Sequence, residues 1–379
     1  MDRNLLLTPG PTQIPPEICE ALGRPIIHHR TPQFQNNIKE VIEGLQYVFQ
    51  TKNDIYLLAA SGTGGMESCV CNLLSPGDKA ITVDGGKFGE RWGDICKCYG
   101  VNADVIKVEW GKAVTPEQIQ AALDKNKDAK AVFITLNETS TGVVTDVKAI
   151  AAVVNKTRAV LVVDAISGLG VVDLQMDAWG VDVVVSASHK GFMLPPGLAF
   201  VAVSPKAFKY VQEAKSPRYY FDFRKSKKAL EKVDTPFTPA IGIVIALVES
   251  LKRMRAQGLD QLFAHFALLA EGTRAAAKAL GLTLFPDETC MSCALTTINL
   301  PAEINGEKLV KTLRDVHGIS VAGGQDHLKG KIIRIAHMGC LTEEDILTGL
   351  EYLEVVLKEQ GYSFAPGAGV NAAKKVFTK

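Results

Sequence analysis

The chain has 379 residues, of which 47% are hydrophobic and 22% are charged, and its formal net charge at pH 7 is +1. This length and composition fit a folded globular protein with a sizeable core and favour two domains. The nearly balanced charge gives no electrostatic reason to expect binding to nucleic acid or to a membrane surface. The apolar run Leu5–Leu7 is too short for a signal peptide, and the longest apolar stretch, Ile241–Val248, is far below the roughly 20 residues that span a bilayer. We therefore expect a cytoplasmic protein.

In the first half of the chain, short apolar runs alternate with helix-like stretches. The expected strands are residues 55–59, 80–83, 131–134, 159–163, 181–185 and 200–203. The expected helices among them include residues 33–49, 66–74 and 147–154. Near-continuous apolar strands separated by helices predict an α/β fold with a mainly parallel sheet that is covered on both faces. Ligands of such sheets bind outside the carboxyl ends of the strands.

The pattern changes after a long helical region over residues 259–280. The elements expected beyond it are the strand 293–300, the helix 307–316, the strand 331–336 and the helix 342–358. Strands and helices that alternate at this wide spacing indicate a smaller α+β domain.

Eight cysteines are scattered along the chain, and two of them, Cys290 and Cys293, form a C-x-x-C pair. Such a pair can be half of a zinc site or a redox couple. The sequence has no second C-x-x-C or H-x-x-x-H that would complete a tetrahedral zinc site. Because scattered cysteines in a protein of this size are more often small buried hydrophobic residues, we favour the structural interpretation.

A glycine-rich segment, AASGTGGMES, occupies residues 59–68 between an expected strand and an expected helix. Free backbone N–H groups and a helix N-terminus suit a phosphate group. The segment is not a P-loop, because no Gly-Lys-Ser/Thr follows, and it lacks the spacing of a dinucleotide fingerprint. An ordinary tight turn would also explain it when it is taken alone.

Two ionisable residues follow apolar strands. Asp164 comes directly after one strand, and a carboxylate buried there needs a partner such as a protonated pyridine nitrogen, although it could also cap the next helix. Lys190 lies among small residues after another strand. Desolvation would lower its pKa and make it nucleophilic toward an aldehyde, whereas the alternative is an exposed loop lysine. Together with the glycine-rich segment, these residues predict a site for a phosphorylated pyridine aldehyde.

In this order the motifs resemble those of the class V aminotransferases, which are fold-type-I pyridoxal-phosphate enzymes, and most of all the alanine/serine–glyoxylate (or –pyruvate) aminotransferases. The resemblance extends from LLLTPGPT at residues 5–12 to KIIRIAHMG at residues 331–339. It implies pyridoxal 5′-phosphate as cofactor, a seven-stranded type of sheet between helices, and a homodimer with shared active sites. The predicted parts are an N-terminal segment 1–20 that contributes to the small domain and the active site, a large cofactor-binding domain 21–255, a small C-terminal domain 256–362 and a flexible tail 363–379.

The resemblance also implies roles for residues around the cofactor ring. Lys190 would bind the cofactor covalently and move the proton, and Asp164 would pair with the ring nitrogen. Ile166 would pack on one face of the ring, and Phe88 in GKFGER would stack on the other. Thr139 in NETSTG would bond the phenolic oxygen of the cofactor.

Other residues would bind the phosphate and the substrate. Thr63, Gly64 and Gly65 would hold the phosphate, and Thr238 in TPFTP would reach the phosphate of the other subunit. His189 is expected to touch the cofactor, at a position where the best-known eukaryotic member has glutamine. The substrate-binding residues are expected to be Arg334, Gly10 and Thr139, with Arg334 clamping the substrate carboxylate in a bidentate manner.

The predicted function is transfer of an amino group from alanine or serine to glyoxylate or pyruvate by a ping-pong mechanism. One alternative is a lyase similar to cysteine desulfurases or kynureninase, although Phe88 replaces the stacking histidine usual in desulfurases. A second is an aminotransferase for a phosphonate or ureido amine. A third is a non-catalytic subunit that keeps the fold for assembly, which the presence of Lys190, Asp164 and Arg334 together disfavours.

Overall fold

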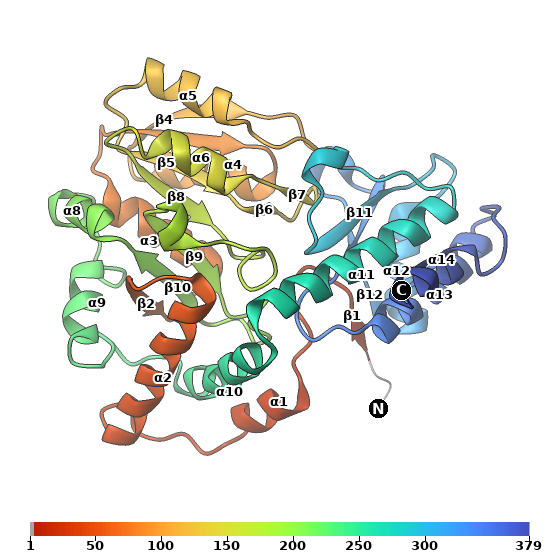
Figure 1. The fold of residues 1–379 in the computed structure, drawn as a ribbon, viewed down its shortest axis with the longest axis horizontal. Helices are drawn as coiled ribbons and strands as arrows, with labels where there is room; N and C mark the ends of the chain where they lie inside the picture. The colour runs from red at the N-terminus through yellow and green to blue at the C-terminus, as the bar shows by residue number, and fades with distance from the viewer. Residues whose placement is uncertain (1–3, 379) are drawn as a thin grey trace.

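The computed structural model describes residues 4–378 and has a seven-stranded sheet at its centre (Figure 1). The strands lie in the order β2 (Asp54–Leu58), β10 (Ala199–Val203), β9 (Val183–Ala187), β8 (Val160–Asp164), β5 (Ala131–Thr135), β3 (Lys79–Asp84) and β4 (Asn102–Lys107). β10 pairs antiparallel with β2 and β9, and the other neighbouring strands pair in parallel. The prediction of an α/β fold with a mainly parallel, seven-stranded sheet is confirmed.

Helices cover both faces of this sheet, because its central strands are apolar on both sides. In β8, Leu161 and Val163 belong to one buried cluster, and Val160 and Val162 belong to a second cluster on the opposite face. The helices of this part are α1 (Pro16–Leu22), α2 (Pro32–Phe49), α3 (Gly62–Leu73), α4 (Lys87–Cys98), α5 (Pro116–Lys125), α6 (Val147–Val154), α7 (Met176–Trp179), α8 (Pro205–Glu213), α9 (Phe223–Leu230) and α10 (Ile241–Gln257). The first cluster contains residues of α2, α5, α6 and α10, and the second contains residues of α3, α4 and α8. No helix of residues 4–378 has both the length and the apolarity needed to cross a membrane.

The long helix α11 (Leu259–Ala279) leads from α10 to a smaller layer of strands and helices (Figure 1). Its sheet has the antiparallel order β11 (Leu295–Asn299), β14 (Ile332–Ala336) and β13 (Ala322–Gly323). The helices α12 (Gly306–His317) and α13 (Glu343–Glu359) pack in this part, and β1 (Leu5–Leu6) pairs in parallel with β12 (Ile319–Ser320). A third buried cluster unites these elements. Leu295 and Ala336 nevertheless belong to the cluster of the large sheet, so the domain boundaries 21–255 and 256–362 stay a prediction.

The C-terminal segment differs from the flexible tail that we predict for residues 363–379. It contains α14 (Ala368–Phe377), which packs against α11 and α13. The backbone turns into this helix at Gly367, whose φ of 74° favours glycine. The buried Glu354 carboxylate accepts hydrogen bonds from the N–H groups of Gly367 and Val370 at 2.8 and 3.0 Å, so α13 caps the first turn of α14. Residue 379 lies outside the described residues.

We predict that substituting Gly272 in α11 loosens this packing. A Cβ atom at Gly272 would overlap the ring of Phe377, so Gly272→Ala should shift α14 and lower the free energy of unfolding by roughly 1–3 kcal/mol. Gly93, in the interior of α4, is the matched control, because a Cβ atom there meets nothing nearer than 3.8 Å. Gly93→Ala should stabilise the protein by about 0.5–1 kcal/mol through helix propensity. Urea unfolding curves measure both effects, and a Gly272→Ala variant as stable as Gly93→Ala would contradict the predicted packing.

Candidate active site

The parallel sheet brings Asp164 and Lys190 to the same edge. Asp164 is the last residue of β8, and Lys190 follows the neighbouring strand β9, whose Val185 pairs with Asp164. Both side chains are buried, since Asp164 is 3% exposed and Lys190 is 9% exposed. Residues far apart in the chain therefore place an acid and an amine at the carboxyl ends of adjacent strands, where sheets of this kind bind ligands.

Burial shifts the pKa of both groups toward neutrality. It raises the pKa of Asp164 to about 7, although the Ile166 N–H donates to Asp164 Oδ1 at 2.9 Å and opposes the shift. Burial lowers the pKa of Lys190 to about 8, against the opposing charge of Asp164. The Lys190 Nζ donates a hydrogen bond to the carbonyl of Pro9. A lysine with this pKa has a substantial neutral fraction near pH 8, which is the nucleophilic form.

The N-terminal segment passes directly over the lysine. Gly10 has a φ of 125°, and a Cβ atom there would overlap the Lys190 amine, so only glycine fits. The Thr12 hydroxyl donates to the Lys190 carbonyl at 2.9 Å, and the Thr12 N–H donates to the His189 carbonyl at 3.3 Å. Burial lowers the pKa of His189 to about 4, and its Nδ1 is buried without a partner among residues 4–378. A neutral ring with one free nitrogen thus lies beside Lys190.

The glycine-rich segment forms the start of α3. The N–H groups of its first turn, which includes Thr63 and Gly64, have no partner within the helix. The N–H of Gly65 is predicted to bind phosphate. In the structure this N–H already donates to the Ser61 carbonyl at 3.2 Å. A Cβ atom at Gly65 would lie 2.8 Å from Val185 Cγ1, so this glycine allows α3 to approach the sheet. The helix start that could hold a phosphate is therefore shorter than predicted.

Ile166 and Phe88 border the same region. Ile166 packs against the first turn of α3, since a Cβ atom at Gly62 would lie 2.5 Å from its Cδ1. Phe88 is half-buried in the first turn of α4. The Arg91 guanidinium carbon lies 4.9 Å from the centre of the Phe88 ring, and Arg91 Nη1 donates to Thr63 Oγ1 at 3.0 Å. Arg91 is the arginine of the GKFGER motif, and it is not among the residues predicted for the site.

Glu138 is a second residue of this region that is not among the predicted site residues. Its buried carboxylate accepts hydrogen bonds from the N–H groups of Phe88 and Gly89 at 3.1 and 2.9 Å. It also accepts from the Ser140 N–H and hydroxyl at 3.1 and 2.6 Å. Burial raises the pKa of Glu138, although these four donors favour the ionised form. The carboxylate thus ties the start of α4, with Phe88, to the turn that carries Thr139.

Arg334 on β14 connects the small sheet to this turn. Its Nε and Nη2 donate to the Gly323 carbonyl at 3.0 and 2.7 Å, and its Nη1 donates to the Thr139 carbonyl at 2.6 Å. A guanidinium has five N–H groups, so these bonds leave one N–H on each terminal nitrogen. Burial lowers the pKa of Arg334 to about 10, which keeps the group cationic at neutral pH. The free pair of N–H groups suits a carboxylate.

Thr238 and the cysteine pair lie apart from this cluster. Thr238 is exposed and lines a shallow pocket with Leu58 and Tyr220. The Cys290 thiol donates to the Gly111 carbonyl at 3.5 Å, whereas the Cys293 thiol donates to the Val171 carbonyl at 3.5 Å. The two thiols therefore contact different segments, and no group of three or more potential metal ligands occurs among residues 4–378.

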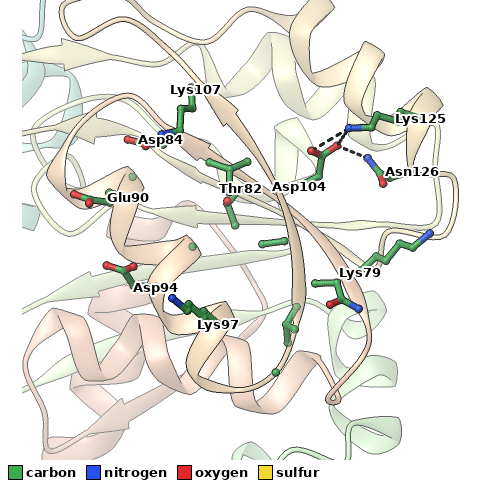
Figure 2. Close-up of a pocket in the computed structure, with 17 residues that line it drawn as sticks. Lys79, Thr82, Asp84, Glu90, Asp94, Lys97, Asp104, Lys107, Lys125 and Asn126 are labelled. Carbon is green, nitrogen blue, oxygen red and sulfur yellow. Dashed lines mark hydrogen bonds and ion pairs between the residues drawn. The ribbon is translucent and has the colours of Figure 1, made fainter.

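A groove of about 900 Å³ lies between α4 and β4 (Figure 2). Its walls carry charged side chains of both signs, including Asp94, Lys97, Asp104 and Lys125. Lys125 donates to Asp104 at 3.1 Å, so part of this charge is paired within the groove. None of the predicted site residues lines it. The volume of a cavity thus does not identify the site in this molecule, whereas the buried ionisable groups do.

The residues around Lys190 fit a phosphorylated pyridine aldehyde. The start of α3 offers unpaired N–H groups, Asp164 is a buried carboxyl group at the end of the strand next to β9, and Lys190 is an amine of lowered pKa. Gly10 leaves no side chain over the amine. These features could together bind the phosphate, the ring nitrogen and the aldehyde of one small molecule.

Comparison with known proteins identifies the family. The sequence pattern of the family "Aminotransferase class-V" matches residues 5–346. The chain is 43% identical to a protein named soluble hydrogenase, small subunit, from Synechococcus, over 100% of this chain and 99% of that protein. It is 36% identical to the L-aspartate–glyoxylate aminotransferase of Paracoccus denitrificans, over 98% and 96% of the two chains. The solved structure of ureidoglycine–glyoxylate aminotransferase from Bacillus subtilis matches with a TM-score of 0.96 and 28% identity, over 100% and 99% of the chains.

These findings confirm the predicted family, fold, reaction class and cofactor. The family match covers most of the chain, and relatives above 30% identity extend over nearly its whole length. The protein therefore belongs to the class V aminotransferases and is a pyridoxal-phosphate-dependent transaminase.

Proposed function

We propose that this enzyme moves the amino group of a small amino acid to glyoxylate or pyruvate in a ping-pong cycle. The observation that carries the proposal is Arg334, which two backbone carbonyls hold in the site while one N–H on each terminal nitrogen stays free. A bidentate clamp of this kind suits the α-carboxylate that amino acids and 2-oxo acids share. Two similar proteins, from Paracoccus denitrificans and Bacillus subtilis, have names that include glyoxylate as a substrate, which supports a small acceptor.

Lys190 and Asp164 would divide the work at the cofactor. Pyridoxal phosphate, when bound, supplies a ring that accepts electrons from the substrate α-carbon. Asp164 would keep the ring nitrogen protonated, and the positive nitrogen would in turn favour the ionised carboxyl group. Lys190 would bind the cofactor covalently and then move the proton at the α-carbon, because its lowered pKa allows it both to take and to return a proton near neutral pH.

The neighbouring residues would fix the cofactor and limit the substrate. Ile166 and Phe88 would lie on the two faces of the ring, and His189 would border it. Thr139 would bond its phenolic oxygen. At the other end, the hydroxyl of Thr63 and the N–H of Gly64 would hold the phosphate, whereas the N–H of Gly65 is occupied by Ser61. The backbone at Gly10 lies close to the Lys190 amine and would leave space for a small substrate only.

We also propose that the enzyme is a homodimer in which Thr238 reaches the phosphate site of the other subunit. The support is an exposed aromatic surface beside Thr238, formed by Tyr219, Tyr220 and Phe237. Tyr219 is 73% exposed, and the Tyr220 and Phe237 rings stack with centres 5.1 Å apart. Aromatic side chains gathered in this way are typical of protein interfaces.

The dimer can be tested at this aromatic surface. Tyr219→Asp should weaken association, because it buries a charge in the proposed interface, whereas Val316→Asp on α12 should not, although Val316 is 71% exposed. Sedimentation velocity of the two variants and the wild type measures the effect. A wild type that sediments as a monomer, or two variants that dissociate equally, would contradict the proposal.

The pH dependence of cofactor binding tests the role of Lys190. The rate at which cofactor-free enzyme captures pyridoxal phosphate should rise with a midpoint near pH 8, because only the neutral Lys190 amine attacks the aldehyde. Asp164→Asn should move the midpoint lower, since the Asp164 charge raises the pKa of Lys190. Borohydride trapping at each pH measures the rate, and Lys190→Ala should trap nothing. A midpoint near 10.5, the ordinary pKa of lysine, would contradict the assignment.

The decisive experiment is a half-reaction screen. Cofactor-loaded enzyme should react with L-alanine or L-serine and convert the cofactor to its amine form, and glyoxylate or pyruvate should reverse the change. L-aspartate and ureidoglycine belong in the screen because two similar proteins are named for them. Visible absorbance follows each step. Release of ammonia or sulfide without a stable amine form would instead support a lyase.

Arg334→Gln is the control for substrate recognition in this screen. Loss of the clamp should cost roughly 2–5 kcal/mol in kcat/KM for amino acids, because the carboxylate then enters the site unpaired. A simple amine without a carboxylate should react at a similar rate with both enzymes. Equal losses for the two kinds of substrate would show that Arg334 acts on something other than the carboxylate.

A further inference from the structure

We propose that Arg91 is the cation that binds the phosphate of pyridoxal phosphate. This inference rests on the proposed cofactor position, with the phosphate at the start of α3. It adds a charged residue to a proposed set of phosphate ligands that is otherwise neutral, namely Thr63 and Gly64 of this chain and Thr238 from the other copy of the chain.

The geometry directs Arg91 toward that position. Arg91 lies in α4, one turn after Phe88, and its guanidinium extends along the Phe88 ring to Thr63 in the first turn of α3. It therefore joins the residue proposed to stack on the cofactor ring with the residue proposed to hold the phosphate. The Arg91 charge also lowers the pKa of Asp164 and of Lys190, so it lies close enough to act on both groups.

The hydrogen bond to Thr63 leaves both residues able to bind an anion. Thr63 Oγ1 accepts from Arg91 Nη1, so the hydroxyl hydrogen of Thr63 is free to donate to a phosphate oxygen. The guanidinium keeps further N–H groups in a planar fork, which matches the geometry of a phosphate. Because Gly65 donates within α3, these groups would replace the donor that Gly65 does not supply.

The balance of charge supports the same conclusion. A phosphate monoester carries about −1.5 to −2 charges at neutral pH, and a helix N-terminus offers only about half a positive charge. Lys87, the other cation in the first two turns of α4, already pairs with Glu90 at 2.6 Å and Asp326 at 3.0 Å. The ion pairs of residues 4–378 do not include Arg91. The Arg91 guanidinium is half-buried and has no carboxylate partner among these residues. A phosphate ligand would explain this arrangement.

The test compares two ligands that differ only in the phosphate. Cofactor-free enzyme is titrated with pyridoxal phosphate and with pyridoxal, and the visible absorbance of the bound form gives each dissociation constant. Arg91→Gln should weaken pyridoxal phosphate by roughly 10- to 100-fold, the usual range for a lost charge-assisted hydrogen bond, and leave pyridoxal almost unchanged. Arg91→Lys keeps the charge without the fork and should lie between the two.

The matched control is Lys97→Gln. Lys97 lies on the same helix, but its side chain lines the groove between α4 and β4 (Figure 2). This variant removes the same charge and should bind both ligands as the wild type does. Inorganic phosphate gives a second readout, because it should raise the melting temperature of the cofactor-free wild type and of Lys97→Gln but not of Arg91→Gln.

Each other outcome overturns the proposal in a recognisable way. Equal weakening of pyridoxal and pyridoxal phosphate by Arg91→Gln would assign Arg91 a structural role through Phe88. Unchanged binding of both, with a loss confined to the L-aspartate half-reaction, would make Arg91 a ligand for a second substrate carboxylate. If Arg91→Gln does not fold, Arg91→Lys decides: it should weaken pyridoxal phosphate and leave pyridoxal almost unchanged, and equal weakening of the two ligands would contradict the proposal. A wild type that binds neither ligand would refute the proposed cofactor position itself.

Discussion

Two ionisable side chains, Asp164 and Lys190, are buried at the carboxyl ends of neighbouring parallel strands, and much of the structure around them serves to tolerate that burial. An isolated charge removed from water is costly, and the opposite pKa shifts of the two groups reflect that cost. They do not simply neutralise each other, because Lys190 donates to the Pro9 carbonyl while Asp164 accepts from the Ile166 N–H. The pair is thus held by separate backbone partners, an arrangement suited to a flat ligand that contacts the carboxyl group at one point and the amine at another.

Backbone carbonyls and amides from distant segments complete this environment. The Pro9 carbonyl comes from the N-terminal segment, the Thr139 carbonyl from the turn after the short strand β6 (Asn137–Glu138), and the Gly323 carbonyl from β13 of the small sheet. Arg334 binds the last two and so connects the small sheet to the turn that carries Thr139. Backbone groups are well suited to this task, since their positions are fixed by the strands and turns that carry them. The position of the proposed Arg334 clamp therefore depends on how the two parts of the molecule pack.

The sequence predicts the central strands well because burial on both faces makes them continuously apolar, as in β5, β8 and β9. It does not predict β4, an edge strand whose exposed positions Asn102 and Lys107 interrupt any apolar run. Asp164 and Lys190 can be found because an ionisable residue at the end of an apolar strand is unusual, whereas Arg334 is found only through the resemblance of its motif to the family. Glu138 and Arg91 cannot be found in this way, because their significance lies in hydrogen bonds to segments about 30 to 50 residues away. Gly65 is the reverse case, a residue that is predicted to bind the phosphate but packs against the sheet. Nothing in the local sequence distinguishes a glycine that binds a ligand from one that packs in this way.

The cost of buried charge also bears on the similarity to proteins named as hydrogenase subunits. A chain that kept this fold only for assembly would gain stability if Asp164, Lys190 and Arg334 were replaced by apolar residues of similar size, because buried ionic groups are often less favourable than well-packed hydrophobic ones. Here all three remain buried, and each has a lowered or raised pKa with backbone partners that fix its position. Glycine also remains at position 10, where any side chain would block the lysine amine. Stability alone does not explain why these residues occupy these positions. A working transaminase site, in contrast, requires an amine, an acid and a carboxylate clamp at one edge of the sheet.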